Sequence, residues 1–275
     1  MKYISKIGAM LFVVTSGASM QGLATEPCGD FGECLALIEI NASDGDIGFH
    51  FLFDGDDLES ARLTDPDGAK LFEYKVGGSL KEQTLTETFA ESAEPLCWND
   101  PEAEEDEEIV TLSEFLERWQ PGIYMVTGKG EEGEKAEGET MLTYHLPAAP
   151  ANVSYNGGVI TWEPGNDLGK CATSGELDDL VNDGSLPMHP EFVAVGAWEV
   201  VMDTVVEDGD PLAKMKFSVR VPASAFQVAV SQEFLDALPA NTEMKIEVGA
   251  IGVDGNATFT ETGDICVNEI EEGCE

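Results

Sequence analysis

The sequence predicts an all-β protein of two β-sandwich domains, with one short helix in the first domain. Short alternating, β-branched and aromatic runs recur along the 275 residues, separated by clusters of Gly, Asp, Asn and Pro. The hydrophobic fraction of 43% is enough to fill two cores. Two prolines among small residues, at 146–150, favour an extended connector. We therefore expect an N-terminal domain at 25–146 and a second domain at 147–275.

The first 24 residues have the pattern of a signal peptide. Lys2 and Lys6 precede an apolar run at 7–14, and small residues follow up to Ala24. Eight apolar residues are too few to cross a bilayer core, which needs about 20. The prediction is a mature chain that begins near Thr25, without a membrane span, in a periplasmic or secreted location.

The first half contains six runs that we expect to be strands: 36–40, 47–53, 71–76, 85–89, 123–127 and 140–146. In the second run, Ile47, Phe49, Phe51 and Phe53 share one face, which predicts a strand facing the core. His50 alternates with these residues and is expected on the opposite face of the sheet.

One helix is expected between these strands. Thr111 and Glu114 have the spacing of a capping box, apolar residues follow on one face, and Pro121 with Gly122 ends the helix. The next strand carries Tyr124 at a position that resembles the tyrosine corner of Ig-like sandwiches. That resemblance implies a hydrogen bond from its hydroxyl to the preceding turn.

The second half resembles a fibronectin type III domain over about 147–267. The resemblance rests on a proline-led first strand, a second strand that ends in Ile-Thr-Trp162-Glu-Pro, a third strand around Trp198, a corner and strand at 238–251, and a turn at 254–256. Two features depart from the family. Met244 replaces the corner tyrosine, and the segment between Trp162 and Trp198 is longer than usual, with a short helix expected near 177–181. Long loops of this kind commonly carry function.

The six cysteines of the mature chain indicate disulfides, because an even number in an exported protein is typical of them. No CxxC spacing is present, so a zinc or redox motif is not predicted. Three cysteines lie in each half, so at least one bond must join the halves if all are oxidised. The cysteines are Cys28, Cys34, Cys97, Cys171, Cys266 and Cys274.

The net charge of −40 limits the partners. Nucleic acid is excluded as a partner, since its phosphates require cations. The charge is consistent with solubility in a salty medium. A sharper hypothesis is calcium binding by loop carboxylates, for which the candidates are Asp44 with Asp46, Asp54 with Asp56 and Asp57, Asp65 with Asp67, and Asp178 with Asp179 and Asp183.

No pattern for catalysis survives inspection, so the sequence predicts no catalytic residue, no cofactor and no assigned metal site. The GxGxxG match at 128–133 precedes a strand instead of a helix, which predicts a hairpin turn. His50, His145 and His189 stand apart from nucleophiles, and His189, between two prolines, is expected at the surface.

These observations favour a non-enzymatic binding or structural module outside the cytoplasm, whose partner is an unknown extracellular protein or polymer. One alternative is an accessory subunit or hydrolase acting on extracellular polymer, with carboxylates in the 163–193 segment. The other alternative is a calcium-stabilised surface module.

Overall fold

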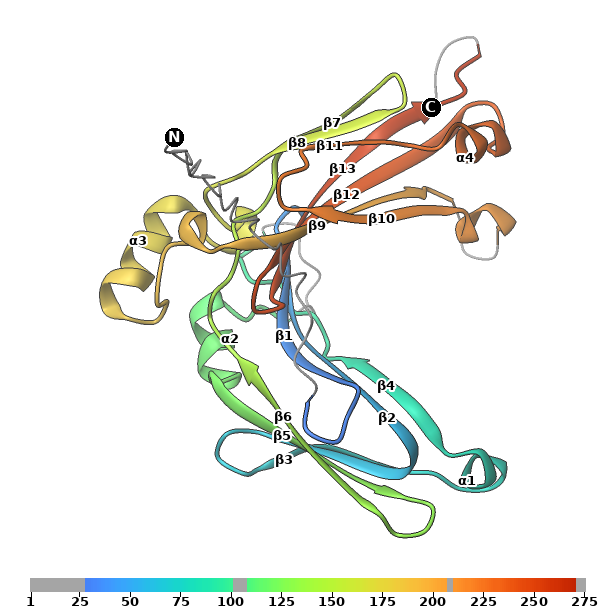
Figure 1. The fold of residues 1–275 in the computed structure, drawn as a ribbon. Coiled ribbons are helices and arrows are strands. Elements are labelled where there is room, and N and C mark those ends of the chain that lie inside the picture. Colours follow the sequence, from blue (N-terminus) through green and yellow to red (C-terminus); the bar gives the residue numbers. More distant parts are fainter. Residues whose placement is uncertain (1–27, 101–107, 207–209, 271–275) are drawn as a thin grey trace, which may run out of the picture.

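The structure is a computed structural model that describes residues 28–100, 108–206 and 210–270. The predicted signal peptide, 1–24, and most of the acidic run at 101–108 lie outside these residues. Strands dominate the regular structure and the helices are short, so the all-β prediction is confirmed (Figure 1). Within the described ranges, no helix is long and apolar enough to cross a membrane.

Thirteen strands and several short helices make up these ranges. The strands are β1 (Glu33–Asn41), β2 (Asp46–Thr64), β3 (Lys70–Lys75), β4 (Leu85–Glu91), β5 (Gly122–Gly130), β6 (Lys135–Leu142), β7 (Ala151–Asn156), β8 (Val159–Glu163), β9 (Val195–Thr204), β10 (Lys216–Pro222), β11 (Gln227–Ala229), β12 (Thr242–Gly252) and β13 (Ala257–Val267). The helices are α1 (Ser79–Gln83), α2 (Leu112–Arg118), α3 (Ser174–Asp183) and α4 (Gln232–Ala237), with 3-10 turns η1 (Gly169–Cys171), η2 (Pro190–Phe192) and η3 (Pro211–Lys214).

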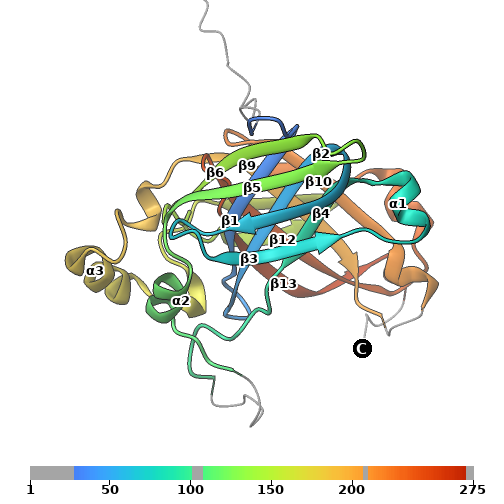
Figure 2. The ribbon, with the colours of Figure 1, turned by 90° about the horizontal axis from the view of Figure 1, so that it is seen from below.

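The long strand β2 organises the first sandwich. Its first part pairs with β1 and β4, and its last part pairs with β5 and β3, so the strand takes part in both layers (Figure 2). The predicted core face is confirmed, because Ile47, Phe49, Phe51 and Phe53 are all buried. Phe51 and Phe53 stack with ring centroids 5.8 Å apart, which adds aromatic packing to the burial.

Two expected strands had the wrong boundaries. The strand expected at 47–53 is β2, which is 19 residues long and runs on to Thr64, with a shift in pairing register between Asp54 and Leu58. Leu58, Ala61 and Leu63 are buried, so the apolar pattern resumes after the irregularity and extends the strand. The strand expected at 140–146 is β6, which ends at Leu142 and starts at Lys135. It starts early because the 128–133 hairpin, as predicted, pairs β5 with β6 immediately after the turn.

The predicted helix is α2, and its capping box between Thr111 and Glu114 is present. Its buried residues face the core of the first sandwich. The tyrosine corner that the resemblance implied is also present, since the Tyr124 hydroxyl donates a hydrogen bond to the Gln120 carbonyl at 3.0 Å. The helix and the strand that follows it are thereby fixed to each other.

The second half forms a β-sandwich around a separate core. One sheet has the order β11-β8-β7, and the facing strands have the order β10-β9-β12-β13. Trp162 of β8 and Trp198 of β9 meet edge to face with ring centroids 6.0 Å apart. Both indoles are buried, which confirms the expected core position of Trp162. The expected turn between the last two strands is present at 253–256.

The two sandwiches share a sheet. β13 pairs in parallel with β1 through Glu39–Asn41 and Ala257–Phe259, so the strands of the second half continue into those of the first (Figure 1). Ser43 Oγ donates to the Glu261 carbonyl and accepts from the Glu261 amide, which extends this contact beyond the ladder. The connector at 146–150 has no regular secondary structure and is buried, and the Pro150 carbonyl accepts a hydrogen bond from the Thr260 hydroxyl of β13 at 2.7 Å.

Candidate functional site

The segment between β8 and β9, residues 164–194, is the strongest candidate for a functional site. It belongs to the second half by sequence, yet its apolar residues pack into the core of the first sandwich. Those buried residues are Leu168, Cys171, Ala172, Leu177 and Leu186. The segment is therefore a structured bridge between the halves and not a free loop.

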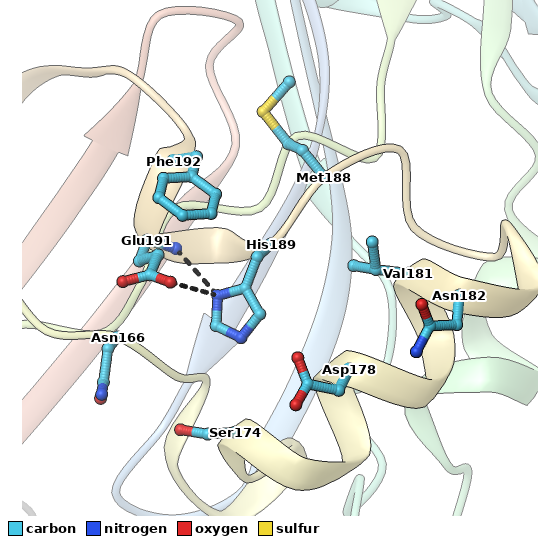
Figure 3. A pocket seen from close by; sticks show the side chains of 9 residues that line it. All are labelled: Asn166, Ser174, Asp178, Val181, Asn182, Met188, His189, Glu191 and Phe192. Atoms are coloured by element: carbon cyan, nitrogen blue, oxygen red, sulfur yellow. Dashed lines mark hydrogen bonds and ion pairs between the residues drawn. The ribbon is translucent and has the colours of Figure 1, made fainter.

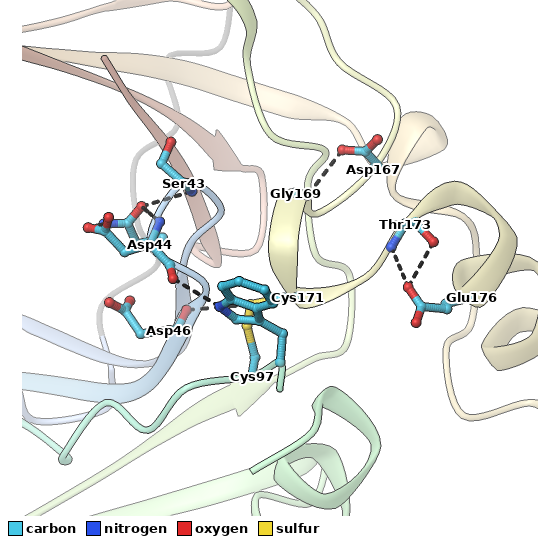
Figure 4. The surroundings of a disulfide bond; sticks show 11 residues. Ser43, Asp44, Asp46, Cys97, Asp167, Gly169, Cys171, Thr173 and Glu176 are labelled. Carbon is cyan, nitrogen blue, oxygen red and sulfur yellow. Dashed lines mark hydrogen bonds between the residues drawn. A yellow bond between two sulfur atoms is a disulfide. The ribbon is translucent and has the colours of Figure 1, made fainter. Parts of the chain in front are cut away.

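A disulfide bond fixes the start of this segment. Cys97 follows β4 in the first half, and Cys171 lies in η1, so their bond joins the halves (Figure 4). Such a bond was expected because each half has an odd number of cysteines. The indole of Trp98 lies beside the bond. Its Nε1 donates to the Asp44 carbonyl at 3.2 Å, and Lys170 Nζ lies 4.8 Å from its ring centroid. The cation and the ring hold η1 against the first sandwich.

The other cysteines are also bonded where they are described. Cys28 pairs with Cys34 at the start of the first sandwich. Cys266, at the end of β13, is disulfide-bonded, whereas Cys274 lies outside the described residues. No described cysteine is a free thiol.

Helix α3 supports the middle of the segment, and the sequence sets both of its ends. Thr173 and Glu176 form a capping box at its N-terminus, where the Thr173 hydroxyl and amide both donate to the Glu176 carboxylate at 2.8 Å. Gly184 takes a left-handed conformation at the C-terminus, where glycine carries no steric penalty. This confirms the short helix expected near 177–181.

A pocket of about 480 Å³ lies between α3 and η2. Figure 3 shows the carboxylate of Asp178 directed toward the ring of His189 across this space. Phe192 stands at the rim with 71% of its surface exposed. The lining residues are Asn166, Ser174, Asp178, Val181, Asn182, Met188, His189, Glu191 and Phe192. Amide, carboxylate, imidazole and aromatic groups are thus available to one ligand.

The expectation that His189 lies at the surface was wrong. Its side chain is only 12% exposed, because it folds under Phe192, with ring centroids 6.2 Å apart, and caps η2. The Glu191 amide approaches His189 Nδ1 at 3.5 Å, and the Glu191 carboxylate lies 3.7 Å from the same nitrogen. Local polar contacts therefore hold the ring in the pocket.

The polar groups of the pocket are not linked as a catalytic triad. Among the described residues, neither Ser174 nor Asp178 makes a hydrogen bond with His189. Nucleophilic catalysis needs a nucleophile within hydrogen-bond reach of its base. The arrangement offers contacts for binding, with Phe192 as an apolar anchor.

The other two histidines do not line the pocket. His145 Nδ1 contacts the Asp254 carboxylate at the junction of the halves. His50 lies on the face of β2 opposite the phenylalanines, as expected, but it is buried there between two carboxylates, Glu39 and Glu94. This grouping was not predicted, since Glu39 and Glu94 are 55 positions apart in the sequence.

The predicted aspartate clusters do not converge as calcium ligands. In the described part of the chain, no group of three or more His, Cys, Asp or Glu ligand atoms meets at any of them. Several of these carboxylates accept hydrogen bonds from nearby groups instead. Asp65 accepts from the Ala69 amide, Asp183 from the Ser185 amide and Asp57 from the Thr84 hydroxyl.

Comparison with known proteins does not assign this chain to a family. No family model and no curated protein matches the sequence. A solved structure described as "Biofilm associated protein - BSP domain" is 12% identical with a TM-score of 0.23, over 88% of this chain and 30% of that one. Another, the "tetra-tandem repeat in extending region of large adhesion protein", is 10% identical with a TM-score of 0.25, over 85% of this chain and 50% of that one. This chain thus spans half or less of either structure, and the TM-scores are too low to support an argument from them.

Proposed function

We propose that the protein is a non-enzymatic binding or structural module that works outside the cytoplasm, in the periplasm or as a secreted protein. Its second half would be a fibronectin type III-like domain. Bonded cysteines support an oxidising compartment, because disulfides persist there and are rare in the cytosol. The large negative charge supports a soluble protein that does not bind anionic polymers.

The observation that carries this proposal is the joining of the two sandwiches into one body. The Cys97–Cys171 bond, the β1–β13 pairing and the packing of 168–186 into the first core all connect the halves. Such connections resist bending at the connector. A body of this kind presents surfaces at a fixed distance and orientation, which is what a spacer or a binding module needs.

The sheet order supports the fibronectin type III-like assignment of the second half. Three strands face four, and a tryptophan from each sheet fills the core. Met244 is fully buried at the position of the missing corner tyrosine, so an apolar contact replaces the hydroxyl bond there. The pocket on 164–194 is the binding surface that we favour, because exposed aromatic residues beside polar groups are common in recognition sites.

Calorimetry of the oxidised mature protein tests the single-body proposal. We expect one cooperative unfolding transition, since unfolding of either sandwich would disrupt the shared sheet and the 168–186 packing. Two separable transitions, each assigned to one half by limited proteolysis, would contradict it. N-terminal sequencing and thiol titration of exported material test the compartment, with a start near Thr25 and no free thiol expected.

A second candidate function is favoured by one observation. The pocket brings Asp178, His189 and Glu191 together, as a hydrolase of extracellular polymer or an accessory subunit would require. Incubation with insoluble cellulose, chitin and peptidoglycan, followed by a reducing-end assay, separates the two functions. We expect no release of product. Release that Asp178→Asn and Glu191→Gln abolish would favour the hydrolase.

A further inference from the structure

A cluster of three side chains that could bind a metal ion lies on the face of β1 and β2 opposite the phenylalanine core, and it shares no residue with the pocket. Glu39 comes from β1, His50 from β2, and Glu94 from the chain just after β4. One ligand atom from each lies within 4.8 Å of the other two. In the described ranges this is the one group of three or more such side chains that meets this closely.

The strand register explains why two of these residues meet. Glu39 lies opposite Gly48 in the β1–β2 pair, and His50 is two residues further along the same face. Backbone hydrogen bonds hold the third residue in place. The Ser92 amide donates to the Phe49 carbonyl, and the Ile47 amide donates to the Pro95 carbonyl, so Glu94 is carried back over β2.

Gly48 provides the space in which the cluster forms. A Cβ atom at this position would lie 2.8 Å from Glu94 Oε1 and 2.9 Å from His50 Nε2, closer than such contacts allow. Glycine weakens a strand interior, and its presence often marks a site where another group must approach closely. Here it lets the Glu94 carboxylate reach the buried imidazole, with Oε1 3.1 Å from Nε2.

The charges of the surroundings favour a cation in this space. The carboxylates of Glu94, Glu199 and Glu91 all interact electrostatically with the Glu39 carboxylate. These carboxylates therefore repel one another across a partly buried surface. A bound cation would relieve that repulsion.

We propose that Glu39, His50 and Glu94 form a binding site for a divalent transition-metal ion of the zinc class. An imidazole nitrogen and two carboxylate oxygens are ordinary zinc ligands, whereas calcium takes oxygen ligands alone. The site is independent of the pocket and of the proposed binding function, and it differs from the aspartate clusters that the sequence brought forward for calcium.

The three side chains must come closer together to hold such an ion. Zinc ligands lie about 2.0–2.2 Å from the metal, so two ligand atoms on one tetrahedral ion are about 3.3 Å apart. Glu94 Oε1 lies 3.1 Å from His50 Nε2, whereas Glu39 Oε2 lies 3.9 Å from the other ring nitrogen, Nδ1. Only one ring nitrogen binds a given ion, so Glu39 has to turn toward the nitrogen that Glu94 faces; one ligand atom of each residue already lies within 4.8 Å of the other two. The Glu39 and Glu94 side chains are 36% and 39% exposed, which leaves them free to turn. A fourth position would be open to water or to a ligand atom from a partner.

Titration calorimetry with zinc chloride tests this site. The protein is the mature chain without an affinity tag, treated with chelator and held in 1 M sodium chloride to suppress weak binding by the acidic surface. We expect one ion per chain. His50→Gln and Glu94→Gln should each weaken binding by about tenfold or more. Even the mutation of residues that only support the metal ligands lowers metal affinity by about 10–100-fold. Glu87→Gln, which removes the same charge from β4, should leave the affinity unchanged.

Three results would overturn the proposal. These are the absence of saturable binding in the wild type, an affinity that neither variant changes, and calcium binding as tight as zinc binding. If His50→Gln fails to fold by circular dichroism, Glu94→Gln decides alone, since its side chain is partly exposed. Cobalt absorption gives a second readout: visible bands of a tetrahedral site should appear in the wild type and be lost in Glu94→Gln.

Discussion

The side-chain oxygen of Asn256, in the turn between β12 and β13, accepts a hydrogen bond from the buried amide of Ile38 in β1 at 2.8 Å. Its amide nitrogen donates to the carbonyls of Thr143 at 2.9 Å and His145 at 3.1 Å. One side chain of the second half thus satisfies three backbone groups of the first half and the connector. Asn256 is 1% exposed, so water cannot replace these bonds.

Asn256→Ala should therefore lower the free energy of unfolding by about 2–3 kcal/mol, because it leaves several buried backbone groups without partners. Denaturant titration of the oxidised mature protein measures the change. Asn182→Ala, at an exposed position of α3, is the control and should stay within about 0.5 kcal/mol of the wild type. Equal effects of the two substitutions would contradict the assigned role of Asn256.

The two described disulfides should differ in their contribution to stability. Cys97 and Cys171 are separated by 74 positions, whereas Cys28 and Cys34 are separated by 6. Closing the longer loop removes more entropy from the unfolded chain, so the chain-entropy relation gives about 4 kcal/mol for the first bond and about 2 kcal/mol for the second. Thermal unfolding of the two paired Cys→Ser variants should show the larger loss for Cys97 with Cys171. The opposite order would refute the entropic account.

The hydrogen bond of the Tyr124 hydroxyl should make a smaller contribution to stability, which a single substitution can measure. Tyr124→Phe removes only the hydroxyl that donates to the Gln120 carbonyl and keeps the buried ring. We expect a loss of about 1 kcal/mol, the usual net value of one hydrogen bond. Denaturant midpoints measure it, with no change expected in the slope of the transition. An unchanged midpoint would mean that the corner bond adds nothing to stability.

Local patterns in the sequence predicted the local structure well. Period-two phenylalanines predicted the core face of β2, and the Thr111 capping box predicted α2, because each signal depends on neighbouring residues alone. The continuation of β2 past Asp57 was not predictable in this way, since three aspartates and a glycine at 54–57 resemble a turn. Only the later burial of Leu58 and Leu63 shows that the strand continues.

Most long-range contacts could not be predicted from the sequence. The cysteine count required one bond between the halves, but not the pairing of Cys97 with Cys171. The packing of 168–186 into the first core, and the burial of His189 under Phe192, depend on where the bridge segment lies in space. Glu39 lies in β1 and Glu94 in the chain just after β4, and only the β1–β2–β4 pairing brings them to one face. The cluster with His50 therefore had no sequence signal apart from Gly48 within a strand.

Asp46 should make stability depend on pH. Burial, followed by the charges of Glu94 and Asp44, raises its pKa from 3.8 to about 6. Since the folded-state pKa lies above the unfolded value, stability from this group is fully present below about pH 4 and is lost as the pH rises through about 6. Asp46→Asn should therefore raise the melting temperature at pH 8. The gain in the free energy of unfolding should be about 1 kcal/mol, since solvent screens part of the charge. At pH 4 the substitution should have little effect. Asp67→Asn, in an exposed turn, controls for the loss of one negative charge, and an equal gain in both variants would contradict the prediction.

Salt should stabilise the protein in a generic way. With a net charge of −40, the compact state is self-repulsive, and the repulsion between exposed carboxylates fades as the Debye length falls from about 30 Å at 0.01 M to about 3 Å at 1 M. We therefore expect the melting temperature to rise strongly with sodium chloride.

A calcium site would act differently. Calcium binding to the native state would add to the free energy of unfolding by an amount that grows with the calcium concentration relative to Kd, and this gain would persist at high sodium. The aspartate clusters do not converge on three ligands, so the extra effect of calcium in 1 M sodium chloride should be small. A flat response to sodium would refute the self-repulsion argument, and a saturable calcium shift in high sodium would favour the calcium-stabilised module over the function proposed above.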